Sequence, residues 1–528
     1  MSSERIESYV GGQWNAGSGP GVALLNPTTE AELARVETGG IDMGQALAFA
    51  RKEGGRALRA LSFAERGALV GQMSAAMHKV REELIDTSVA NGGCTRGDAK
   101  FDVDGAIGTL AAYAELGKTL GDARVLADGE GIQLGRSPRF WGQHVHTPRT
   151  GVAVFINAFN FPAWGFAEKA ACALLAGMPV LCKPATATAL TAYRMMKALI
   201  QAELAPRGVL SFIGGAPGDL LDHLDVQDVL AFTGSAFTGR KLRERKNIIE
   251  KSIPLNVEAD SLNAAVLGPD VELGSDAMNL FLREVSKDLT QKTGQKCTAV
   301  RRILVPAARV DDVVAELSAR LAEIKIGDPA LAEVGMGPLA TRQQLEDVRA
   351  GTKKLREDAQ VVFGNAEAAP ALVGATAGKG FFHPILLLLA KDARAAKNVH
   401  SHEVFGPVAT VLPYSGEAEE AADLVGLGQG SLVASLYSDD KTFIEKATLG
   451  IAPWTGRIYI GGAKVFDHTL GPGTVLPLSV HGGPGRAGGG EELGGLRGVK
   501  HYMQRTALQG YRPIVEAISG TKSEKPQT

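Results

Sequence analysis

Cysteine is scarce in this chain of 528 residues, which contains only Cys94, Cys172, Cys182 and Cys297. A secreted disulfide scaffold carries far more, and no two of the four have the CxxC spacing of a zinc site. We therefore expect free thiols in a reducing compartment and predict a cytoplasmic protein.

An excess of charge of one sign is also missing, because 56 lysines and arginines balance 58 aspartates and glutamates, for a formal net charge of −2. This balance gives no indication of nucleic acid or an anionic membrane as a partner. No N-terminal signal of basic and apolar residues is visible. The longest aliphatic run, 385–390, is far shorter than the roughly 18 residues of a membrane span, so we interpret it as a buried strand.

Glycine is abundant, with 65 residues, and hydrophobic residues make up 45% of the chain. Both values suit an α/β protein with many tight turns, and the length favours two or three modules. Between residues 150 and 260, short β-type runs alternate with helical ones, the pattern of βαβ units in a parallel, nucleotide-binding sheet. The predicted strands are 152–156, 180–183, 209–213, 229–232 and 254–257, and the predicted helices are 163–176, 188–204, 218–224 and 235–245.

A second α/β pattern follows residue 260. Its predicted helices are 275–291, 310–324 and 341–358, and its predicted strands are 303–305, 384–389 and 432–437. Residues 9–14 predict a small strand and turn, and 40–120 are mostly helical in composition. We expect 136–150 to form a protruding hairpin, the glycine-rich 471–495 an ordered loop, and the polar residues after 520 a frayed tail.

Cys297 stands in Gly294-Gln295-Lys296-Cys297-Thr298, directly after an amphipathic helix. Its thiol should therefore emerge where helix meets loop. A lone cysteine is by default an inert buried residue, so the prediction of a reactive thiol depends on the neighbouring motifs.

Two polar side chains follow strands of the predicted sheet at their carboxyl ends, where open α/β sheets place ligands. Asn160 follows the first strand, and its amide can face a carbonyl group or cap the helix that starts near Pro162. Glu258 follows the last strand, where a general base and an ordinary solvated carboxylate are both open interpretations. We expect these strand ends to converge on one rim.

Other segments on that rim suit a dinucleotide. In Phe232-Thr233-Gly234-Ser235 the serine can cap a helix whose free N–H groups face a phosphate. Lys183 can reach a ribose or phosphate, or merely solubilise a strand end. Glu403 and Phe405 can offer a carboxylate and an aromatic wall, or form an ordinary turn. The GxGxxG fingerprint is missing from this sheet; its literal match at 483–488 has no predicted strand before it and no helix after it, so we regard that match as accidental.

Two histidine pairs, His144 with His146 and His400 with His402, have alternate spacing. Neither pair has an obvious third ligand. We interpret them as surface histidines and predict no metal site.

Together these segments resemble the aldehyde dehydrogenase superfamily, over about residues 9–510. The matching segments occur in the family's order: 9–36, the Asn160 segment, 183–185, 232–235, Glu258, 294–297 and 403–407. That order is far more specific than any single motif. The resemblance implies an α/β fold with a Rossmann-like cofactor domain, an α/β catalytic domain and a β oligomerisation arm, and hence a homodimer or homotetramer.

The implied boundaries are 1–130 for the N-terminal part of the cofactor domain, 131–149 for the oligomerisation hairpin, 150–262 for the Rossmann-like domain, 263–480 for the catalytic domain, 481–515 for the C-terminal loop and oligomerisation strand near 501–508, and 516–528 for the tail.

The resemblance also implies roles for individual residues. Cys297 would be the nucleophile, Asn160 and the Cys297 backbone N–H the oxyanion hole, and Glu258 the base that lets water release an acid. Lys169 and Glu492 match positions that help to move protons or shape the site. The implied cofactor contacts are Lys183, Thr186, Gly234, Ser235, Glu403 and Phe405.

Three departures from the family's pattern modify these expectations. The family's common Glu-Leu-Gly-Gly is Glu258-Ala259-Asp260-Ser261 here, which keeps the carboxylate but changes its surroundings. Thr186 stands where NAD-preferring members often carry a glutamate that would repel a 2′-phosphate, so we predict a preference for NADP, with NAD possible. The segment 481–499 resembles dehydrogenases of phenylacetyl-CoA and benzoyl-CoA breakdown, which implies an unsaturated semialdehyde carrying a CoA thioester as substrate.

Four alternatives stay open. The substrate could be a different aldehyde. A CoA-acylating dehydrogenase would pass the acyl group to CoA, although such members usually lack the counterpart of Glu258. A cysteine acyltransferase or hydrolase would use Cys297 without nicotinamide. A non-catalytic protein on the same scaffold is disfavoured, because every expected catalytic position is filled.

Overall fold

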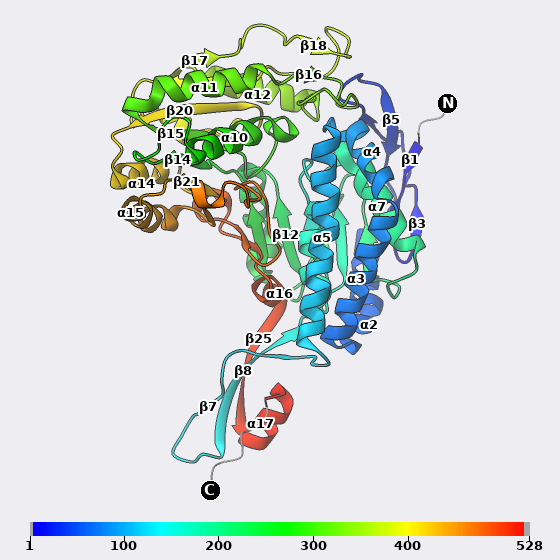
Figure 1. Ribbon diagram of the computed structural model, residues 1–528. Helices are drawn as coiled ribbons and strands as arrows, with labels where there is room; N and C mark the ends of the chain where they lie inside the picture. Colours follow the sequence, from blue (N-terminus) through cyan, green and yellow to red (C-terminus); the bar gives the residue numbers. More distant parts are fainter. Residues whose placement is uncertain (1–3, 522–528) are drawn as a thin grey trace.

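The computed structural model describes residues 4–521 and contains two seven-stranded sheets (Figure 1). The first sheet has the order β13-β12-β9-β10-β11-β2-β3, parallel from β13 to β11 and antiparallel at the β2–β3 edge. Its strands are β2 Ser8–Val10, β3 Gln13–Asn15, β9 Ala153–Ile156, β10 Val180–Lys183, β11 Leu210–Phe212, β12 Val229–Thr233 and β13 Leu255–Glu258. The strands predicted between 150 and 260 are confirmed, each boundary within one residue, and 9–14 lie in the hairpin β2–β3.

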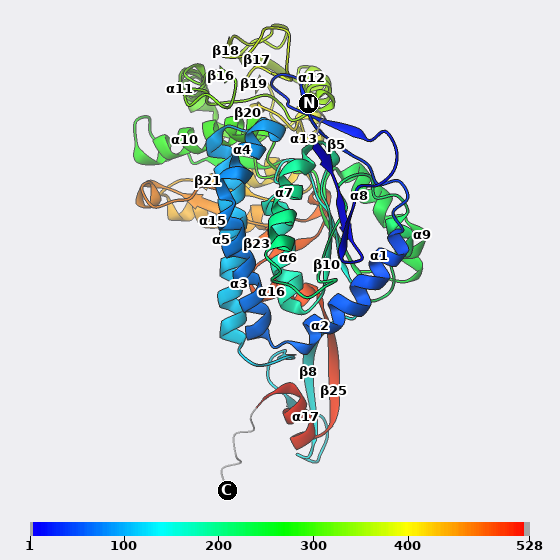
Figure 2. The same ribbon diagram turned by 90° about the vertical axis from the view of Figure 1, so that its right-hand side faces the viewer.

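Helices cover both faces of this sheet (Figure 2). One face carries α6 and α7, with α3, α4 and α5 packed outside them, and the other carries α1, α8 and α9. The bounds are α1 Met43–Phe49, α2 Gly55–Ala60, α3 Phe63–Lys79, α4 Arg81–Gly92, α5 Arg96–Leu120, α6 Trp164–Ala176, α7 Ala189–Gln201, α8 Ala236–Arg243 and α9 Lys246–Glu250.

The helix predicted at 218–224 is wrong. Only a 3-10 turn, Leu220–His223, forms there. Gly218 directly before it has a left-handed backbone with φ of 54°, and β12 begins soon after, so no room remains for a full helix.

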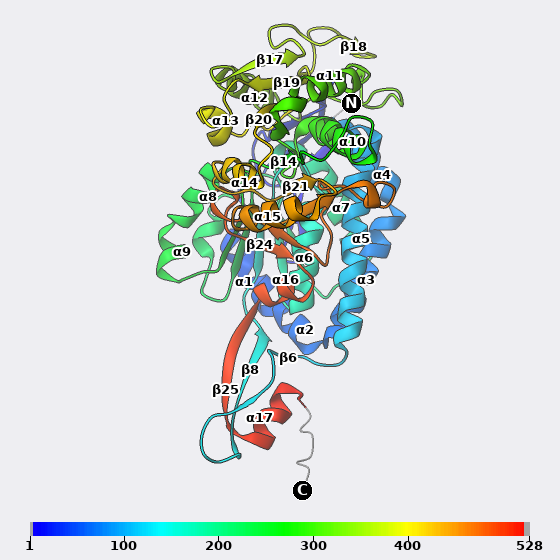
Figure 3. The same cartoon turned by 60° about the vertical axis from the view of Figure 1, so that its left-hand side comes forward.

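The second sheet has the order β17-β19-β20-β15-β14-β21-β22, and helices again cover both faces (Figure 3). Its strands are β14 Ala264–Leu267, β15 Arg302–Pro306, β17 Ala359–Phe363, β19 Leu386–Ala390, β20 Val408–Tyr414, β21 Ala434–Tyr437 and β22 Ile458–Gly461. The helices are α10 Asp276–Thr290, α11 Val310–Ala322, α12 Arg342–Leu355, α13 Lys397–Ser401, α14 Ala418–Gly426 and α15 Lys441–Ile451.

The leucine run at 385–390 is a buried strand, as predicted. Leu386 and Leu388 pack into the core on one side of the sheet, and Leu387 packs into the core on the other. A strand covered by helices on both faces needs apolar side chains at every position, which explains why this run shows no alternation.

Smaller sheets lie outside the two seven-stranded ones. They consist of β1 Glu4–Ile6, β4 Val22–Leu25 and β5 Glu32–Val36; β16 Ile326–Gly327 and β18 Leu372–Val373; and β23 Val480–Gly482 and β24 Glu491–Leu493, followed by α16 Leu496–His501. The loop predicted at 471–495 is thus ordered and contains the short hairpin β23–β24.

An arm projects from the first sheet (Figures 1 and 3). It consists of β8 Phe140–Pro148 paired antiparallel with β25 Met503–Tyr511, with β6 Leu126–Ala127 and β7 Ile132–Gln133 also paired to β8. The predicted hairpin is present, since β7 and β8 pair antiparallel around the turn between them, and β25 contains the C-terminal strand expected near 501–508. Residues 140–148 form one strand, whose long partner lies more than 350 residues later in the chain.

The segment predicted as tail from 516 begins inside a helix, α17 Arg512–Ser519. The Arg512 guanidinium lies 4.1 Å from the centre of the Trp141 ring and forms an ion pair of 2.7 Å with Glu516, which attaches α17 to the arm. The tail prediction is thus wrong for 516–519, and 522–528 lie outside the described residues.

The interpretation of the histidine pairs as surface residues is also wrong in part. His144 is exposed, but His146 and His400 are buried. The His400 ring contacts the Arg302 guanidinium at 3.1 Å and the Ala393 carbonyl at 2.6 Å. Among residues 4–521, no helix combines the length and the apolar character that crossing a membrane requires.

Two glycines of α5 provide a matched test of its packing. A Cβ on Gly105 would meet the Trp164 ring at 2.2 Å, whereas a Cβ on Gly108 would meet nothing within 4 Å. We expect Gly105→Ala to lower the free energy of unfolding by about 1–3 kcal/mol through overpacking. Gly108→Ala should raise it by up to about 1 kcal/mol, because alanine favours helix. Denaturant unfolding measures both, and equal stabilities would contradict this packing of α5 on α6.

Candidate active site

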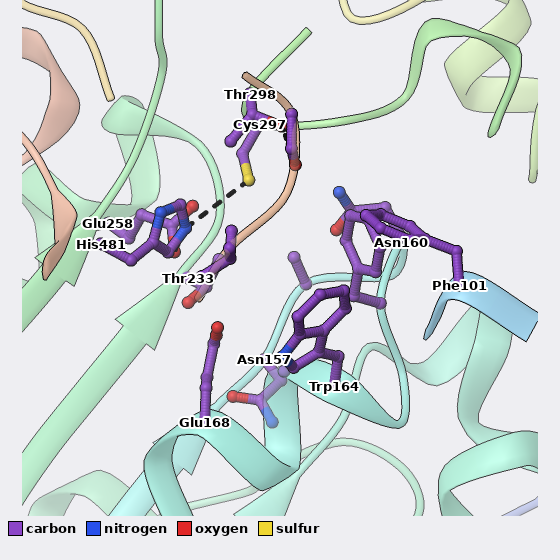
Figure 4. A pocket seen from close by; sticks show the side chains of 15 residues that line it. Phe101, Asn157, Asn160, Trp164, Glu168, Thr233, Glu258, Cys297, Thr298 and His481 are labelled. Atoms are coloured by element: carbon purple, nitrogen blue, oxygen red, sulfur yellow. Dashed lines mark hydrogen bonds and ion pairs between the residues drawn. The ribbon is translucent and has the colours of Figure 1, made fainter. Parts of the chain in front are cut away.

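The carboxyl ends of β9, β12 and β13 meet the loop that carries Cys297 around a cavity of about 40 Å³ (Figure 4). Asn160 comes from the loop after β9, Thr233 ends β12 and Glu258 ends β13. The structure thus brings together the sulfur, the amide and the carboxylate that the sequence singled out. The amide and the carboxylate lie on one rim of the first sheet, and the sulfur comes from the loop after α10.

A tight turn aims Cys297 into this cavity. After α10, Lys292, Thr293 and Gly294 have consecutive positive φ angles of 52°, 58° and 67°. Such angles are costly for residues with a side chain and persist only where the surroundings enforce them. Here Lys292 N–H donates to Asp98 at 2.9 Å and the Thr293 hydroxyl to Gly337 O at 3.0 Å.

Asn160 is held with a donor to spare. Its amide nitrogen donates to the Gln295 carbonyl at 3.0 Å, and the side chain is buried. An amide nitrogen carries two hydrogens, so one remains for another acceptor. Figure 4 shows this amide facing the space beside the Cys297 sulfur.

The pKa values of the Cys297 thiol and the Glu258 carboxyl group are shifted in opposite directions. Burial, together with the negative charge of Glu258, raises the pKa of the Cys297 thiol well above its usual value. Burial would also raise the pKa of Glu258, but the charge and hydrogen bond of His481, with help from Lys169, lower it instead. The resting site therefore holds a neutral thiol beside an ionised carboxylate.

His481, in β23, is a site residue that the sequence reasoning missed. Its Nε2 lies 3.2 Å from Glu258 Oε2 and 3.8 Å from Cys297 Sγ (Figure 4). The signal that could have found it is its place in the same glycine-rich segment as Glu492, which it faces in the hairpin β23–β24. The short strand β23 also precedes the GxGxxG match at 483–488, contrary to expectation, although β24 and not a helix follows that match.

Lys169 lies in a buried cluster of carboxylates next to the cavity. Its ammonium forms ion pairs with Glu168 at 2.8 Å and with Glu492 at 3.1 Å, and Asn256 donates to Glu492 at 3.3 Å. Carboxylate oxygens of Glu168, Glu258 and Glu492 all lie within 4.8 Å of one another. Burial raises the pKa of Glu492 well above its usual value, in contrast to the lowered pKa of Glu258.

A larger cavity of about 700 Å³ also borders Cys297 and extends past the carboxyl ends of β9, β12 and β13 in the first sheet. Its lining includes Gly234, Ser235, Glu403 and Phe405, while Lys183 and Thr186 flank the lining residue Ala185. Phe405 packs edge-to-face on Phe159 with ring centres 5.8 Å apart. Gly234, Ser235, Glu403 and Phe405 therefore line one cavity, whose volume lies in the range of ligand sites, whereas Lys183 and Thr186 are only near it in the chain and do not line it.

The donors and acceptors of this cavity fit a polar ligand such as a dinucleotide. Asn157 Oδ1 and Thr233 Oγ1 are buried along it without a hydrogen-bond partner among residues 4–521. Ser235 caps α8 by accepting the Thr238 N–H, as predicted. The Asp260 carboxylate accepts the neighbouring Ala236 N–H at 2.8 Å, so a phosphate at this helix end would have to share or displace Asp260.

A trough of about 710 Å³ adjoins the small cavity along α5. Phe101, Trp164 and Val475 line both spaces, so the trough leads to Cys297 from a direction other than that of the large cavity. Small residues of α5 leave space for the trough: Gly97, Gly105, Gly108 and Ala112.

Comparisons with known proteins agree with this architecture. Residues 14–508 match the aldehyde dehydrogenase family. The 3,4-dehydroadipyl-CoA semialdehyde dehydrogenase of Aromatoleum evansii is 45% identical over 480 residues, which cover 91% of this chain and 93% of that protein. The chain belongs to the aldehyde dehydrogenase family, whose members are oxidoreductases that act on aldehydes and use NAD(P).

Solved structures share the fold. Lactaldehyde dehydrogenase from Escherichia coli superposes with a TM-score of 0.83 at 23% identity, covering 96% of this chain and 99% of its own. An NAD+ complex of aldehyde dehydrogenase from Bacillus cereus superposes with a TM-score of 0.81 at 22% identity, covering 96% and 97%. The predicted aldehyde dehydrogenase fold, with two sheets and an arm, is confirmed.

Glu403 should give stability a distinct pH dependence. Its Oε2 accepts the Ser261 N–H and its Oε1 lies 3.6 Å from Arg301, yet burial raises its pKa from the usual 4.5 to about 7. Between these values the folded protein holds a proton that the unfolded chain has lost, so stability falls as pH rises. Relative to Glu403→Gln, the wild type should lose on the order of 3 kcal/mol across this window. Denaturant midpoints of both proteins measure the difference, and a constant difference would contradict it.

Proposed function

We propose that this protein oxidises a semialdehyde carried on a CoA thioester, in particular 3,4-dehydroadipyl-CoA semialdehyde, to the acid, with NADP as the preferred acceptor. The observation that carries the proposal is the place of Cys297 between two spaces. A cavity of dinucleotide size lies on one side and a trough leads in on the other. The relative from Aromatoleum evansii supports the choice of substrate.

In the first step the Cys297 thiolate attacks the aldehyde carbon and forms a thiohemiacetal. The negative charge that develops on oxygen is stabilised by the spare N–H of Asn160 and the backbone N–H of Cys297. Each such donor contributes about 3 kcal/mol in well-studied enzymes. The fixed position of Asn160 against Gln295 means that this donor needs no rearrangement.

A bound NAD(P) supplies the acceptor for the hydride that leaves the thiohemiacetal. In this proposal Gly234 and Ser235 would hold its phosphates, Glu403 would bind ribose hydroxyls and Phe405 would contact the nicotinamide ring. Lys183 and Thr186 would serve the adenosine ribose. Thr186 carries no charge to repel a 2′-phosphate, which supports NADP, with NAD as the weaker alternative.

Water then releases the acid from the Cys297 thioester. Glu258 acts as the base, since its carboxylate is ionised and its Oε1 has no hydrogen-bond partner among the described residues. The proton can pass on through Glu492 and Glu168, which Lys169 holds in contact. A base for water favours an acid product over transfer to free CoA.

The trough along α5 suits a long, narrow group between the aldehyde and the bulk of the substrate. We assign it to the pantetheine arm of CoA, with the nucleotide outside. The glycines of α5 leave room for that arm, and Lys100 and Asp104 provide charge at the edge. A small aldehyde would leave the trough unused.

We further propose a cytoplasmic homodimer or homotetramer assembled through the arm. β25 forms an edge of the arm sheet, and Phe140, Tyr511, Ile514 and Ile518 expose apolar surface nearby. An unpaired edge beside apolar side chains is the kind of surface that a second subunit covers. In this scheme the domain boundaries follow the two sheets, with the cofactor domain ending near 262 and the catalytic domain near 480.

Replacing the proposed base should separate the two halves of the reaction. We expect Glu258→Gln to release about one equivalent of reduced cofactor per active site in a burst. Steady turnover should then be about a hundredfold to ten-thousandfold slower, because the thioester persists. Stopped-flow absorbance of the reduced nicotinamide measures both phases. Cys297→Ser, as control, should give no burst, and full steady turnover by either variant would contradict the mechanism.

The trough and the cofactor preference can be tested together. We expect Gly108→Phe to raise KM for 3,4-dehydroadipyl-CoA semialdehyde at least about tenfold while leaving butanal oxidation nearly unchanged. Gly108 is exposed and a Cβ there would meet nothing within 4 Å, so we expect the fold to tolerate the substitution. In the wild type, kcat/KM should be higher for the CoA-linked aldehyde than for butanal, and higher with NADP than with NAD.

Thr119→Phe, on an exposed site near the end of α5 and outside the trough, is the matched control. Higher efficiency with NAD would contradict the argument from Thr186. A Gly108→Phe variant equally impaired with both aldehydes would contradict the trough. A requirement for free CoA, or a CoA thioester of the oxidised carbon as product, would identify a CoA-acylating enzyme instead.

A further inference from the structure

Asp260 stands at the end of the large cavity where the proposed cofactor phosphates would lie. Its Oδ1 accepts the N–H of Ala236, the first residue of α8, at 2.8 Å. Asp260 lines the cavity of about 700 Å³ together with Gly234 and Ser235. A carboxylate therefore already binds a backbone donor that a phosphate at this helix end would need.

The charge of Asp260 disagrees with the ligand that the rest of the cavity fits. Asn157 lines the cavity, is only 5% exposed and has an Oδ1 without a hydrogen-bond partner among residues 4–521, which indicates a ligand with donors. A dinucleotide supplies such donors, but its pyrophosphate is negative. Two negative groups at one helix end repel each other and compete for the same N–H.

We propose that Asp260 weakens the binding of the dinucleotide and speeds its release, because its carboxylate repels the pyrophosphate and competes with it for the Ala236 N–H. The inference rests on the proposed position of the phosphates at Gly234 and Ser235, but not on the identity of the aldehyde. NAD and NADP carry the same pyrophosphate, so Asp260 sets the affinity for both and not the choice between them.

Backbone hydrogen bonds fix the position of Asp260 beside this helix end. The N–H of Gly234 donates to Glu258 O at 3.1 Å, so the segments that leave β12 and β13 stay paired up to the start of α8. The N–H of Ala259 donates to Ala487 O at 3.0 Å. Because the backbone is held, a bound phosphate must share the donor with the Asp260 carboxylate or rotate that side chain away from it.

The helix α8 does not depend on Asp260 for its cap. The Ser235 hydroxyl oxygen accepts the N–H of Thr238 at 3.3 Å, which satisfies one of the free donors at the helix start. Asp260 is a second acceptor at the same end, on a different N–H. A neutral residue in place of Asp260 should therefore leave α8 folded and change mainly the charge that a ligand meets.

Charged groups from other segments lie near Asp260. The Asp260 charge favours the protonated forms of His402 and Glu403, in the loop before β20, and Arg486, between β23 and β24, opposes this effect on both. Lys354 of α12 also acts on His402 and lines the same cavity. The wall thus holds charges of both signs, so a test of Asp260 needs a control that removes a negative charge elsewhere on this wall.

Isothermal titration calorimetry with NADP and with NAD, in the absence of aldehyde, tests the proposal. Asp260→Asn removes the charge but keeps an oxygen that can accept the Ala236 N–H. We expect it to lower Kd for both cofactors by a similar factor, at least about fivefold at low salt. This factor should shrink toward one at high salt, because ions screen the repulsion. Most of the change should appear as slower release of NADPH in stopped-flow displacement.

Asp347→Asn is the matched control, since Asp347 is an exposed aspartate of α12 that lines the same cavity. We expect it to change Kd by less than about twofold. Asp260→Ala, which leaves the Ala236 N–H free, should bind at least as tightly as Asp260→Asn, and thermal unfolding shows that each variant is folded. Unchanged or weaker binding by both folded Asp260 variants would overturn the proposal. So would equal tightening by Asp347→Asn, or tightening that does not depend on salt.

Ala236→Pro separates failure of this inference from failure of the proposed phosphate site. Proline lacks the N–H and is tolerated at the first helical position, and Ser235 before it has the extended backbone that proline requires, with φ of −72° and ψ of 146°. We expect Kd to rise at least about threefold for both cofactors. Unchanged affinity in folded Ala236→Pro would refute the phosphates at α8. Weaker binding there, without tightening in Asp260→Asn, would keep that site and refute only the role of Asp260.

Discussion

The buried ion pair between Lys169 and Glu492 is the contact on which the site depends. Lys169 belongs to α6, on the face of the first sheet, and Glu492 belongs to β24 near the C-terminus. Because an unpaired charge in such surroundings costs several kcal/mol, the pair fixes the late hairpin onto the early domain. That hairpin places His481 near the end of β13, in contact with Glu258 and Cys297.

The structure lets two reactants approach one sulfur from different sides. The large cavity opens beside the carboxyl end of β12, where Ser235 caps α8, and the trough runs along the glycines of α5. The small cavity of about 40 Å³ shares lining residues with both of them and contains Cys297. This separation allows a long substrate and a dinucleotide to bind at the same time without competing for space, and it leaves little room for stray water at the reacting carbon.

Local sequence patterns predicted the local structure well. The strands from β9 to β13 follow from short apolar runs between helical segments, and β19 follows from an uninterrupted leucine run that only a doubly covered strand can accommodate. The convergence of Asn160 and Glu258 follows from the rule that parallel strands end at one rim, whereas the position of Cys297 beside them was expected only from the family resemblance. The arm, with its C-terminal strand, was expected from the family resemblance and not from local patterns, because the pairing of β8 with β25 joins residues far apart in the chain.

What the sequence could not predict are contacts made by folding. Nothing local indicates that His481 reaches Cys297, since the hairpin that places it is held by Asn256 and Lys169 from other elements. The burial of His146 and His400 likewise depends on the arm and on Arg302. Asp260 at the end of α8 was recognised as a departure, but its role in capping Ala236 needed the structure.

The neutral resting state of the Cys297 thiol has a consequence for survival under oxidative stress. Peroxides react with thiolates far faster than with thiols, and Cys94, Cys172 and Cys182 are buried in the structure. A buried thiol whose pKa is raised in this way spends little time as the thiolate that peroxides attack. The burial and the nearby Glu258 charge that hinder ionisation of Cys297 thus also protect its sulfur from oxidation to sulfenic acid between turnovers.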